Sequence, residues 1–297
     1  MPPAIGITAA EHIAIGLVDG HQLAAPLRIH STEPGPDSLL SMPPAEIAAC
    51  FVREIQAVDS SRQACAIGVA LPGIVRCGYI EESPNLRQLK GAHMGDLISN
   101  ALAEAGIAAP VSIFNDADVM AAGLAATRGV LHQHIRVWTL GNGVGFGVYP
   151  GREGVWEGGH MVVSLDPRER YCGCGGQGHL EGVMGHRAMR LRFLDMEPDE
   201  IFENARLGDQ RCTNFVELWH RALAAATASS IHMVGPGKFF ISGFNAKHVD
   251  LALLNQYLHE MVKMSPLQGY VFEVVSGSDE IGVIGAAVNA LRLALPE

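Results

Sequence analysis

The chain of 297 residues lacks several features that would assign it to a class of protein at once. It carries a formal net charge of -10 and no run of basic residues, which disfavours nucleic-acid binding. No apolar run is long enough to span a bilayer. The first residues have neither a basic segment nor a cleavage pattern, so we expect no secretion signal. We therefore expect neither a nucleic-acid partner nor a membrane partner.

Cysteine is also sparse, because the 6 cysteines are scattered apart from one pair, Cys172 and Cys174. Such scatter is not a disulfide framework, and it favours a reducing, cytoplasmic location. Glycine is abundant instead, at 34 residues against a usual share of about 7%. We expect many tight turns, or loops that approach a ligand closely.

The hydrophobic content of 48% is sufficient for one large domain or two of moderate size. Apolar alternation and helical spacing predict strands and helices between turn signals. The main predicted elements are a β-hairpin at 4–19, a helix at 44–58, strands at 64–71 and 111–114, a helix at 118–126, a glycine-interrupted hairpin at 137–150, helices at 198–207 and 214–233, and a strand and turn at 239–244.

One short stretch concentrates side chains that bind soft metals: His160, Cys172, Cys174 and His179. Zinc takes thiolate sulfur and imidazole nitrogen in a closed tetrahedron when it is structural. The intervening glycines let the backbone turn tightly around an ion. The alternatives are a chance grouping or a disulfide, and a single residue between the two cysteines strains disulfide geometry. The stretch predicts a structural zinc site.

The same stretch resembles the signature of the ROK family of bacterial sugar kinases and sugar-responsive regulators. The signature Glu-x-Gly-His corresponds to residues 157–160, and Cys-x-Cys-Gly-x-x-Gly-Cys-x-Glu to residues 172–181. His179 stands where the family has its third cysteine, which changes a Cys3His site to Cys2His2 and keeps four zinc ligands.

The resemblance implies a two-domain α/β fold of the actin-like ATPase (ribonuclease H-like) type, with an interdomain cleft. It implies an N-terminal domain at 1–116, completed by a last helix at about 284–297, and a zinc-bearing C-terminal domain at 117–283. A homo-oligomer, specifically a dimer, is expected. Regulators of the family carry a DNA-binding segment before the first hairpin, and we expect none here because that hairpin starts at Ala4.

The resemblance also implies a sugar site with Asp116 as the catalytic base. The substrate-binding residues carried over from the family motifs are Gly73, Asn85, Asn115, Asp116, Glu157, His160 and Glu181. From the residues alone, Pro72-Gly73 is also compatible with a plain turn, and Asp116 with a helix N-cap. Because capping and catalysis are compatible, both interpretations stay open.

The nucleotide motifs of the family are only partly present. Glycines remain in a second phosphate loop and near the adenosine segment, so the resemblance implies cofactor-binding residues Gly141, Asn142, Gly143 and Gly243. The first phosphate loop has lost its aspartate and both glycines, and Glu11 adds negative charge there. Alanine side chains prevent the close backbone approach of a phosphate cradle.

These losses predict sugar or polyol binding together with weak Mg-ATP binding. Three functions remain open. The first is a kinase that phosphorylates a hexose or amino sugar. The second is a sugar-binding protein without catalysis. The third is an ATP-independent isomerase, epimerase or hydrolase that uses the same sugar pocket, and fold alone does not decide among them.

Overall fold

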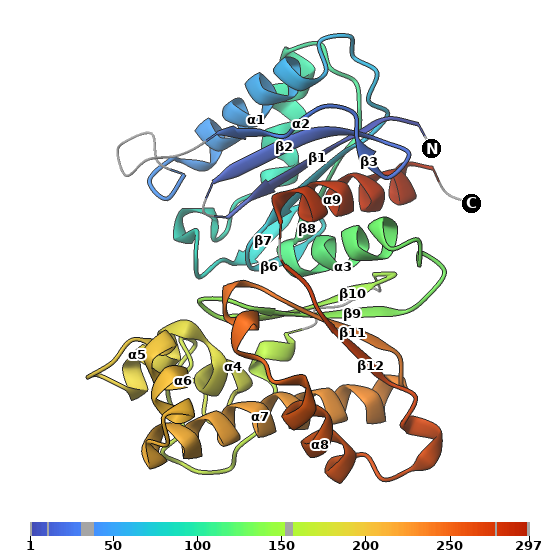
Figure 1. Cartoon of the computed structure of the whole chain (residues 1–297). Coiled ribbons are helices and arrows are strands. Elements are labelled where there is room, and N and C mark those ends of the chain that lie inside the picture. Colours follow the sequence, from blue (N-terminus) through green and yellow to red (C-terminus); the bar gives the residue numbers. More distant parts are fainter. Residues whose placement is uncertain (1, 11, 31–38, 152–156, 277, 296–297) are drawn as a thin grey trace. The chain divides into compact units, whose positions relative to one another are not determined.

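The computed structural model describes residues 2–10, 12–30, 39–151, 157–276 and 278–295, so Glu11 lies outside the described residues (Figure 1). The chain forms two compact units, each described by itself below. Unit 1 comprises Met1–Gln133, Gly147–Val155 and Ser278–Glu297, and unit 2 comprises His134–Phe146 and Trp156–Gly277. The domain boundary expected at residue 116 stays a prediction.

Unit 1 is built on a six-stranded sheet in the order β3-β2-β1-β5-β8, with β4 also paired to β2. Strand β1 is antiparallel to β2 and parallel to β5, which is in turn parallel to β8. The strands are β1 (Ala4–Ala9), β2 (Ile13–Asp19), β3 (Gln22–Leu23), β4 (Arg28–His30), β5 (Ile67–Leu71) and β8 (Val111–Asn115). A separate two-stranded sheet is formed by β6 (Ile74–Arg76) and β7 (Tyr79–Glu82), followed by η1 (Arg87–Leu89).

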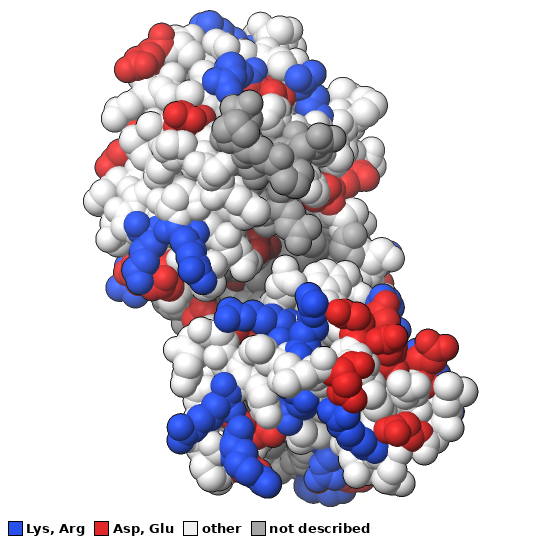
Figure 2. Space-filling model, turned by 90° about the vertical axis from the view of Figure 1, so that its left-hand side faces the viewer, with Lys and Arg blue, Asp and Glu red and all other residues white. Residues whose placement is uncertain are grey.

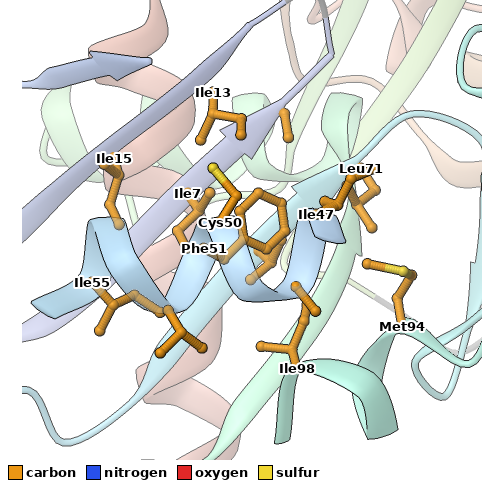
Figure 3. Packing of buried hydrophobic residues seen from close by; sticks show 14 of the residues in the cluster. Ile7, Ile13, Ile15, Ile47, Cys50, Phe51, Ile55, Leu71, Met94 and Ile98 are labelled. Carbon is orange, nitrogen blue, oxygen red and sulfur yellow. The ribbon is translucent and has the colours of Figure 1, made fainter. Parts of the chain in front are cut away.

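One face of this sheet is covered by the helices α1 (Pro44–Val58) and α2 (Met94–Glu104). Figure 3 shows the resulting core, in which isoleucines of the strands point toward Phe51 of α1. Alternate residues of β1 and β2, among them Ile7 and Ile15, are fully buried there. Period-two alternation in the strands and a 3.6-residue period in α1 place these side chains on the facing surfaces.

The opposite face carries α3 (Asp116–Thr127) and α9 (Asp279–Ala294), which pack closely. Four glycines lie where a backbone carbonyl of α9 or α3 comes closest: Gly6, Gly68, Gly123 and Gly285. A side chain at any of them would collide with that carbonyl. Glycine therefore lets the two helices lie against the sheet and each other at close range.

Unit 2 contains a four-stranded sheet in the order β10-β9-β11-β12, where β11 runs parallel to β9 and β12. Its strands are β9 (Ile135–Leu140), β10 (Val144–Tyr149), β11 (Lys238–Ser242) and β12 (Val271–Val274), and the last three residues of β10 are assigned to unit 1. The helices are α4 (Leu180–Met184), α5 (His186–Arg192), α6 (Pro198–Arg206), α7 (Gln210–Val234) and α8 (Leu251–Met261), with short turns η2 (Gly158–His160), η3 (Phe244–His248) and η4 (Ser265–Leu267).

The predicted elements are confirmed in kind, and three helices begin earlier than predicted. The structure places the starts of α3, α7 and the last helix, α9, at Asp116, Gln210 and Asp279. In each case the preceding side chain accepts a hydrogen bond from a first-turn amide, and these caps are Asn115, Asp209 and Ser278. The cap and the first turn of each helix are polar. The repeat of apolar residues that predicts a helix therefore begins only after them, and the predicted start lies too far along the chain. Among the described residues, no helix is long and apolar enough to cross a membrane.

Candidate functional site

The candidate residues of unit 1 lie at the carboxyl ends of two neighbouring parallel strands. Leu71, the last residue of β5, pairs with Asn115, the last residue of β8. The Pro72-Gly73 turn and Asp116 follow directly. Ligands of open α/β sheets bind outside this edge, so the sheet brings Gly73, Asn115 and Asp116 together where a ligand is expected.

Side-chain hydrogen bonds fix the backbone at this edge. The Asn115 Oδ1 accepts from the Ala117 amide at 2.8 Å, and its Nδ2 donates to the Gly73 carbonyl at 2.8 Å. The buried Ser83 hydroxyl donates to the Pro72 carbonyl at 2.8 Å. Gly73 has φ of 112°, and a side chain there would collide with the backbone of β7. The turn is therefore fixed by hydrogen bonds, and its conformation requires glycine at residue 73.

Asp116 is the first residue of α3, and its side chain is exposed. The N-cap of α3 is Asn115, so the capping role considered for Asp116 belongs to its neighbour. Asp116 Oδ1 also accepts from the Ala117 amide at 2.9 Å. Asn85 is exposed as well, and among the described residues its side chain makes no hydrogen bond with this group. The carboxylate of Asp116 is accessible to a ligand.

In unit 2 the four predicted metal ligands come together. The ligand atoms of His160, Cys172, Cys174 and His179 all lie within 4.8 Å of one another. The Cys174 Sγ is 3.3 Å from both the Cys172 Sγ and the His179 Nδ1. In tetrahedral zinc sites with bonds of about 2.0–2.3 Å, ligand atoms lie about 3.3–3.8 Å apart. The donor set and its spacing fit a zinc ion.

The loop that carries the ligands is held by its own backbone and by an arginine. The Gly178 carbonyl accepts from the Val163 amide at 2.8 Å, and Gly178 has φ of 71°. Arg192 forms an ion pair with Glu169, and its guanidinium lies 4.4 Å from the centre of the Tyr171 ring. These contacts position the loop from both sides of the ligand cluster.

Hydrogen bonds and burial shift the pKa values of the side chains in this cluster. The bond with the Cys172 thiol, followed by that with Glu157, raises the pKa of His160 to about 11. Burial raises the pKa of the Cys172 thiol and lowers the pKa of His179, which the charge of His160 lowers further. His160 Nδ1 donates to Glu157 at 3.1 Å, which leaves Nε2 for a metal. A carboxylate behind a ligating histidine is the usual outer partner of a zinc site.

Glu181 connects the metal cluster to the glycine-rich turn between β9 and β10. One oxygen accepts from the Cys172 thiol at 3.4 Å, and the other accepts from the Val144 amide at 3.2 Å. A side chain at Gly143 would collide with the second oxygen. The role of Glu181 as a sugar contact stays a prediction, and the structure places its carboxylate beside the predicted phosphate loop.

The turn at 141–143 is anchored through its carbonyl groups. The Gly141 carbonyl accepts from the His186 amide at 3.0 Å and from the Asn245 side chain at 3.3 Å. The side chain of Asn142 is exposed. The turn is thus fixed at one side and open to solvent at the residue that replaces the family's threonine.

Gly243 occupies a position that excludes any side chain. Its φ is 94°, and a Cβ would collide with the backbone of Leu140. The next residue, Phe244, is half exposed and lies edge-on to His186 with ring centres 5.2 Å apart. Gly243 is therefore required by its packing against β9, whether or not it also contacts a ligand.

Sequence reasoning placed Ser83 in a segment that resembles a family segment near the sugar pocket, but it did not predict the bond of Ser83 to the Pro72 carbonyl. It missed Arg187, an exposed cation whose amide is bonded to the turn. The contact of Ser83 depends on the pairing of distant segments, and no signal in the sequence pointed to Arg187.

Comparison with known proteins gives relatives over most of the chain. The chain is 28% identical to a glucokinase of Thermotoga maritima over 287 residues, covering 84% of this chain and 87% of that protein. It is 29% identical to an N-acetylmannosamine kinase of Haemophilus influenzae, covering 54% of this chain and 56% of that protein. Several relatives are thus matched over little more than half their length.

The fold has a close counterpart among solved structures. A ROK hexokinase from Thermus thermophilus matches with a TM-score of 0.78 at 22% identity, covering 97% of both chains. This similarity shows the actin-like ATPase fold. The sequence model described as ROK family matches residues 11–292. By this match, together with the fold and the Cys/His cluster, the chain belongs to the ROK family of sugar kinase-like proteins.

Proposed function

We propose that this protein is a sugar kinase whose acceptor is a hexose or an amino sugar. The observation that carries the proposal is the polar edge of unit 1, where Asn115 holds the Gly73 turn and Asp116 remains exposed. The names of the relatives, glucokinase and N-acetylmannosamine kinase, support this acceptor class.

In the proposed reaction Asp116 acts as general base. The oxygen of a sugar hydroxyl forms a bond to the terminal phosphorus of the donor. The bond from that phosphorus to the bridging oxygen breaks, and the donor leaves one phosphate shorter. The hydroxyl proton passes to the Asp116 carboxylate. Phosphoryl transfer depends mainly on positioning and electrostatics, and a base adds about 10²–10⁴-fold.

On unit 1 the proposed sugar contacts are Gly73, Asn85 and Asn115, and on unit 2 they are Glu157 and Glu181. Amide and carboxylate groups hydrogen-bond hydroxyls, and a charged acceptor strengthens the bond. We assign the zinc ion to His160, Cys172, Cys174 and His179, where it would supply a structural crosslink of the loop. His160 would then contact the sugar only as a metal-bound ring, because a ligating imidazole is not free to shuttle protons.

We propose weak Mg-ATP binding at the hairpin of unit 1. Ala9 is buried, and the Ala10 amide donates within the turn to the His12 carbonyl at 3.3 Å. His12 forms a hydrogen bond with Asp279 at 2.8 Å, and Glu280 follows at the start of α9. The backbone amide is engaged and the neighbouring carboxylates repel phosphate at short range. These features support loss of the first phosphate loop.

A sugar panel measured with and without Mg-ATP tests the proposal. Release of ADP together with a phosphorylated sugar supports it. Sugar binding without any chemical change would identify a sugar-binding protein. A changed sugar without a phosphate donor would identify an isomerase, epimerase or hydrolase.

A further inference from the structure

Gly176 lies inside the metal-binding loop, between Cys174 and His179. It falls on a position that the signature of the ROK family leaves open, and His179 falls on the position where the signature has cysteine. The structure brings these two residues into contact. A Cβ placed on Gly176 would collide with Cε1 of His179 and would lie 2.6 Å from Nε2 and 2.7 Å from Nδ1. Glycine at residue 176 therefore leaves the space that the imidazole occupies.

The imidazole of His179 has little freedom to move away from such a side chain. An isolated β-bridge joins the backbone of His179 to Val162, and the His179 carbonyl accepts from the Gly182 amide at 3.0 Å, at the start of α4. The ring lies edge-on to the ring of His160, with ring centres 5.2 Å apart. A methyl group at residue 176 would therefore have to turn the imidazole about its own side-chain bonds. A turned ring would no longer hold its nitrogen beside Cys174.

Gly176 contacts two of the four metal ligands. Its amide donates to the Cys174 Sγ at 3.2 Å, and the His179 Nδ1 lies 3.3 Å from the same sulfur. The φ of Gly176 is not positive, so alanine can adopt the same backbone conformation and keep the amide bond. Alanine at residue 176 would consequently disturb the imidazole and leave the bond to the sulfur in place.

The atoms that exclude a side chain at residue 176 belong to histidine. The two ring atoms nearest to the added Cβ are Cε1 and Nε2 of His179. A cysteine side chain ends at its sulfur and has neither atom. With cysteine at residue 179, as in the family signature, residue 176 would be free to carry a side chain. The requirement for glycine arises with the imidazole.

We propose that Gly176 is a positioning residue that allows His179 to act as the fourth ligand of the metal site, so that the residue types at positions 176 and 179 depend on each other. The metal is the zinc ion assigned to this donor set. Groups that orient a metal ligand typically change the metal affinity by about 10- to 100-fold when they are altered. The inference concerns the metal site and does not rest on the proposed kinase function.

Competition with a chromophoric chelator measures the zinc affinity of the intact chain. We expect Gly176→Ala to weaken zinc binding by about 10- to 100-fold in the wild-type background. Where His179→Cys is already present, the same change should alter zinc affinity by no more than about twofold, because sites that do not interact give additive effects. His179→Ala, which removes the ring, provides a second background in which Gly176→Ala should have equally little effect.

Gly269→Ala is the matched control in the same unit. Gly269 is exposed, its φ is not positive, and nothing lies within 4 Å of an added Cβ, so zinc affinity should equal that of the wild type. Figure 2 shows charged side chains spread over one face of unit 2, and Gly176→Ala changes none of them. A change in zinc affinity therefore reports the geometry of the ligands rather than surface charge.

Cobalt in place of zinc provides a spectroscopic readout of the ligands. The ligand-field absorption of cobalt depends on how many nitrogen and sulfur atoms bind it. Cobalt-loaded Gly176→Ala should therefore absorb like cobalt-loaded His179→Ala and unlike the wild type. Far-UV circular dichroism of each variant checks that the fold is retained.

Three outcomes would overturn the inference. The first is wild-type zinc affinity in Gly176→Ala. The second is an equal loss in the wild-type and His179→Cys backgrounds, which would assign Gly176 to the backbone of the loop rather than to the imidazole. The third is a wild-type protein that binds no zinc. Turnover does not enter any of these measurements, so an inactive protein would refute the proposed kinase and leave this inference standing.

Discussion

Asp116 and Asn115 are adjacent in sequence, yet the structure predicts that substituting Asp116 affects turnover and that substituting Asn115 affects stability. Asp116→Asn keeps the shape and the Oδ1 acceptor that the Ala117 amide uses at 2.9 Å, and it removes the proton acceptor. Asn115→Ala removes both the cap of α3 and the bond to Gly73. The first change should affect chemistry and the second should affect the fold.

The loss of activity follows from the role of a general base. Removing a base lowers turnover by about 10²–10⁴-fold, which is about 2.7–5.5 kcal/mol in the barrier. Sugar affinity should stay within about tenfold, or about 1.4 kcal/mol, because an amide replaces the carboxylate at the same place. The stability cost should stay within about 0.5 kcal/mol, since the side chain is exposed.

The stability loss of Asn115→Ala is the larger one. A lost N-cap costs about 1 kcal/mol, and the bond to the Gly73 carbonyl contributes about 1 kcal/mol more. In chains of this size each kcal/mol lowers Tm by about 2–4 °C, so we expect a drop of about 4–8 °C. Turnover should fall as far as the lost Asn115 contact and the displaced Gly73 turn weaken sugar binding.

Thermal unfolding, sugar calorimetry and a coupled kinase assay on both variants provide the comparison. The expected pattern is an inactive Asp116→Asn with wild-type Tm and an active but less stable Asn115→Ala. If Asp116→Asn retains full turnover, or loses as much stability as Asn115→Ala, the carboxylate is structural and the assignment of the base is wrong.

The remaining predictions concern the metal, its loop and the donor. Protein purified without chelators should carry about one zinc per chain by elemental analysis. The Cys174→Ser variant should lose the zinc and unfold at a lower temperature, because metal binding is coupled to folding. Zinc-free wild-type protein would contradict this prediction. Gly178→Ala should destabilise more than Gly175→Ala by thermal unfolding, because both have positive φ but only Gly178 faces a backbone carbonyl, that of Ser164. Mg-ATP should bind with Kd above about 10 μM by calorimetry, while a sugar of the panel binds measurably; tighter Mg-ATP binding would return the chain to ordinary kinases.

Much of the fold was predictable because apolar periods mark it. The helix at Pro44–Val58 was predicted with its observed bounds, since its buried residues recur at helical spacing after a proline. The start of helix α3 was harder to predict, because most residues of this helix are buried on all sides and are small. A helix without a polar face gives no amphipathic period, so its start at Asp116 was missed.

In the candidate site, too, groups that are close in sequence were predictable and contacts between distant residues were not. The zinc ligands were predictable because Cys172, Cys174 and His179 are close in sequence and the chemistry fixes their spacing. The bond between Asn115 and Gly73 joins residues 42 positions apart, so only the pairing of β5 with β8 creates it.

The close packing of α9 has a consequence for the order of folding. Val283, Ile284, Ala287 and Leu291 belong to the core of unit 1, beside Ala4 and Ala14 from the other end of the chain. Unit 1 therefore cannot complete its core until the residues that form unit 2 have been synthesised. At about 5–20 residues per second, that delay is on the order of 10–30 s. During that interval the face of the sheet that includes Gly6 and Gly68 has no α9 to cover it, which makes it the surface a chaperone would meet.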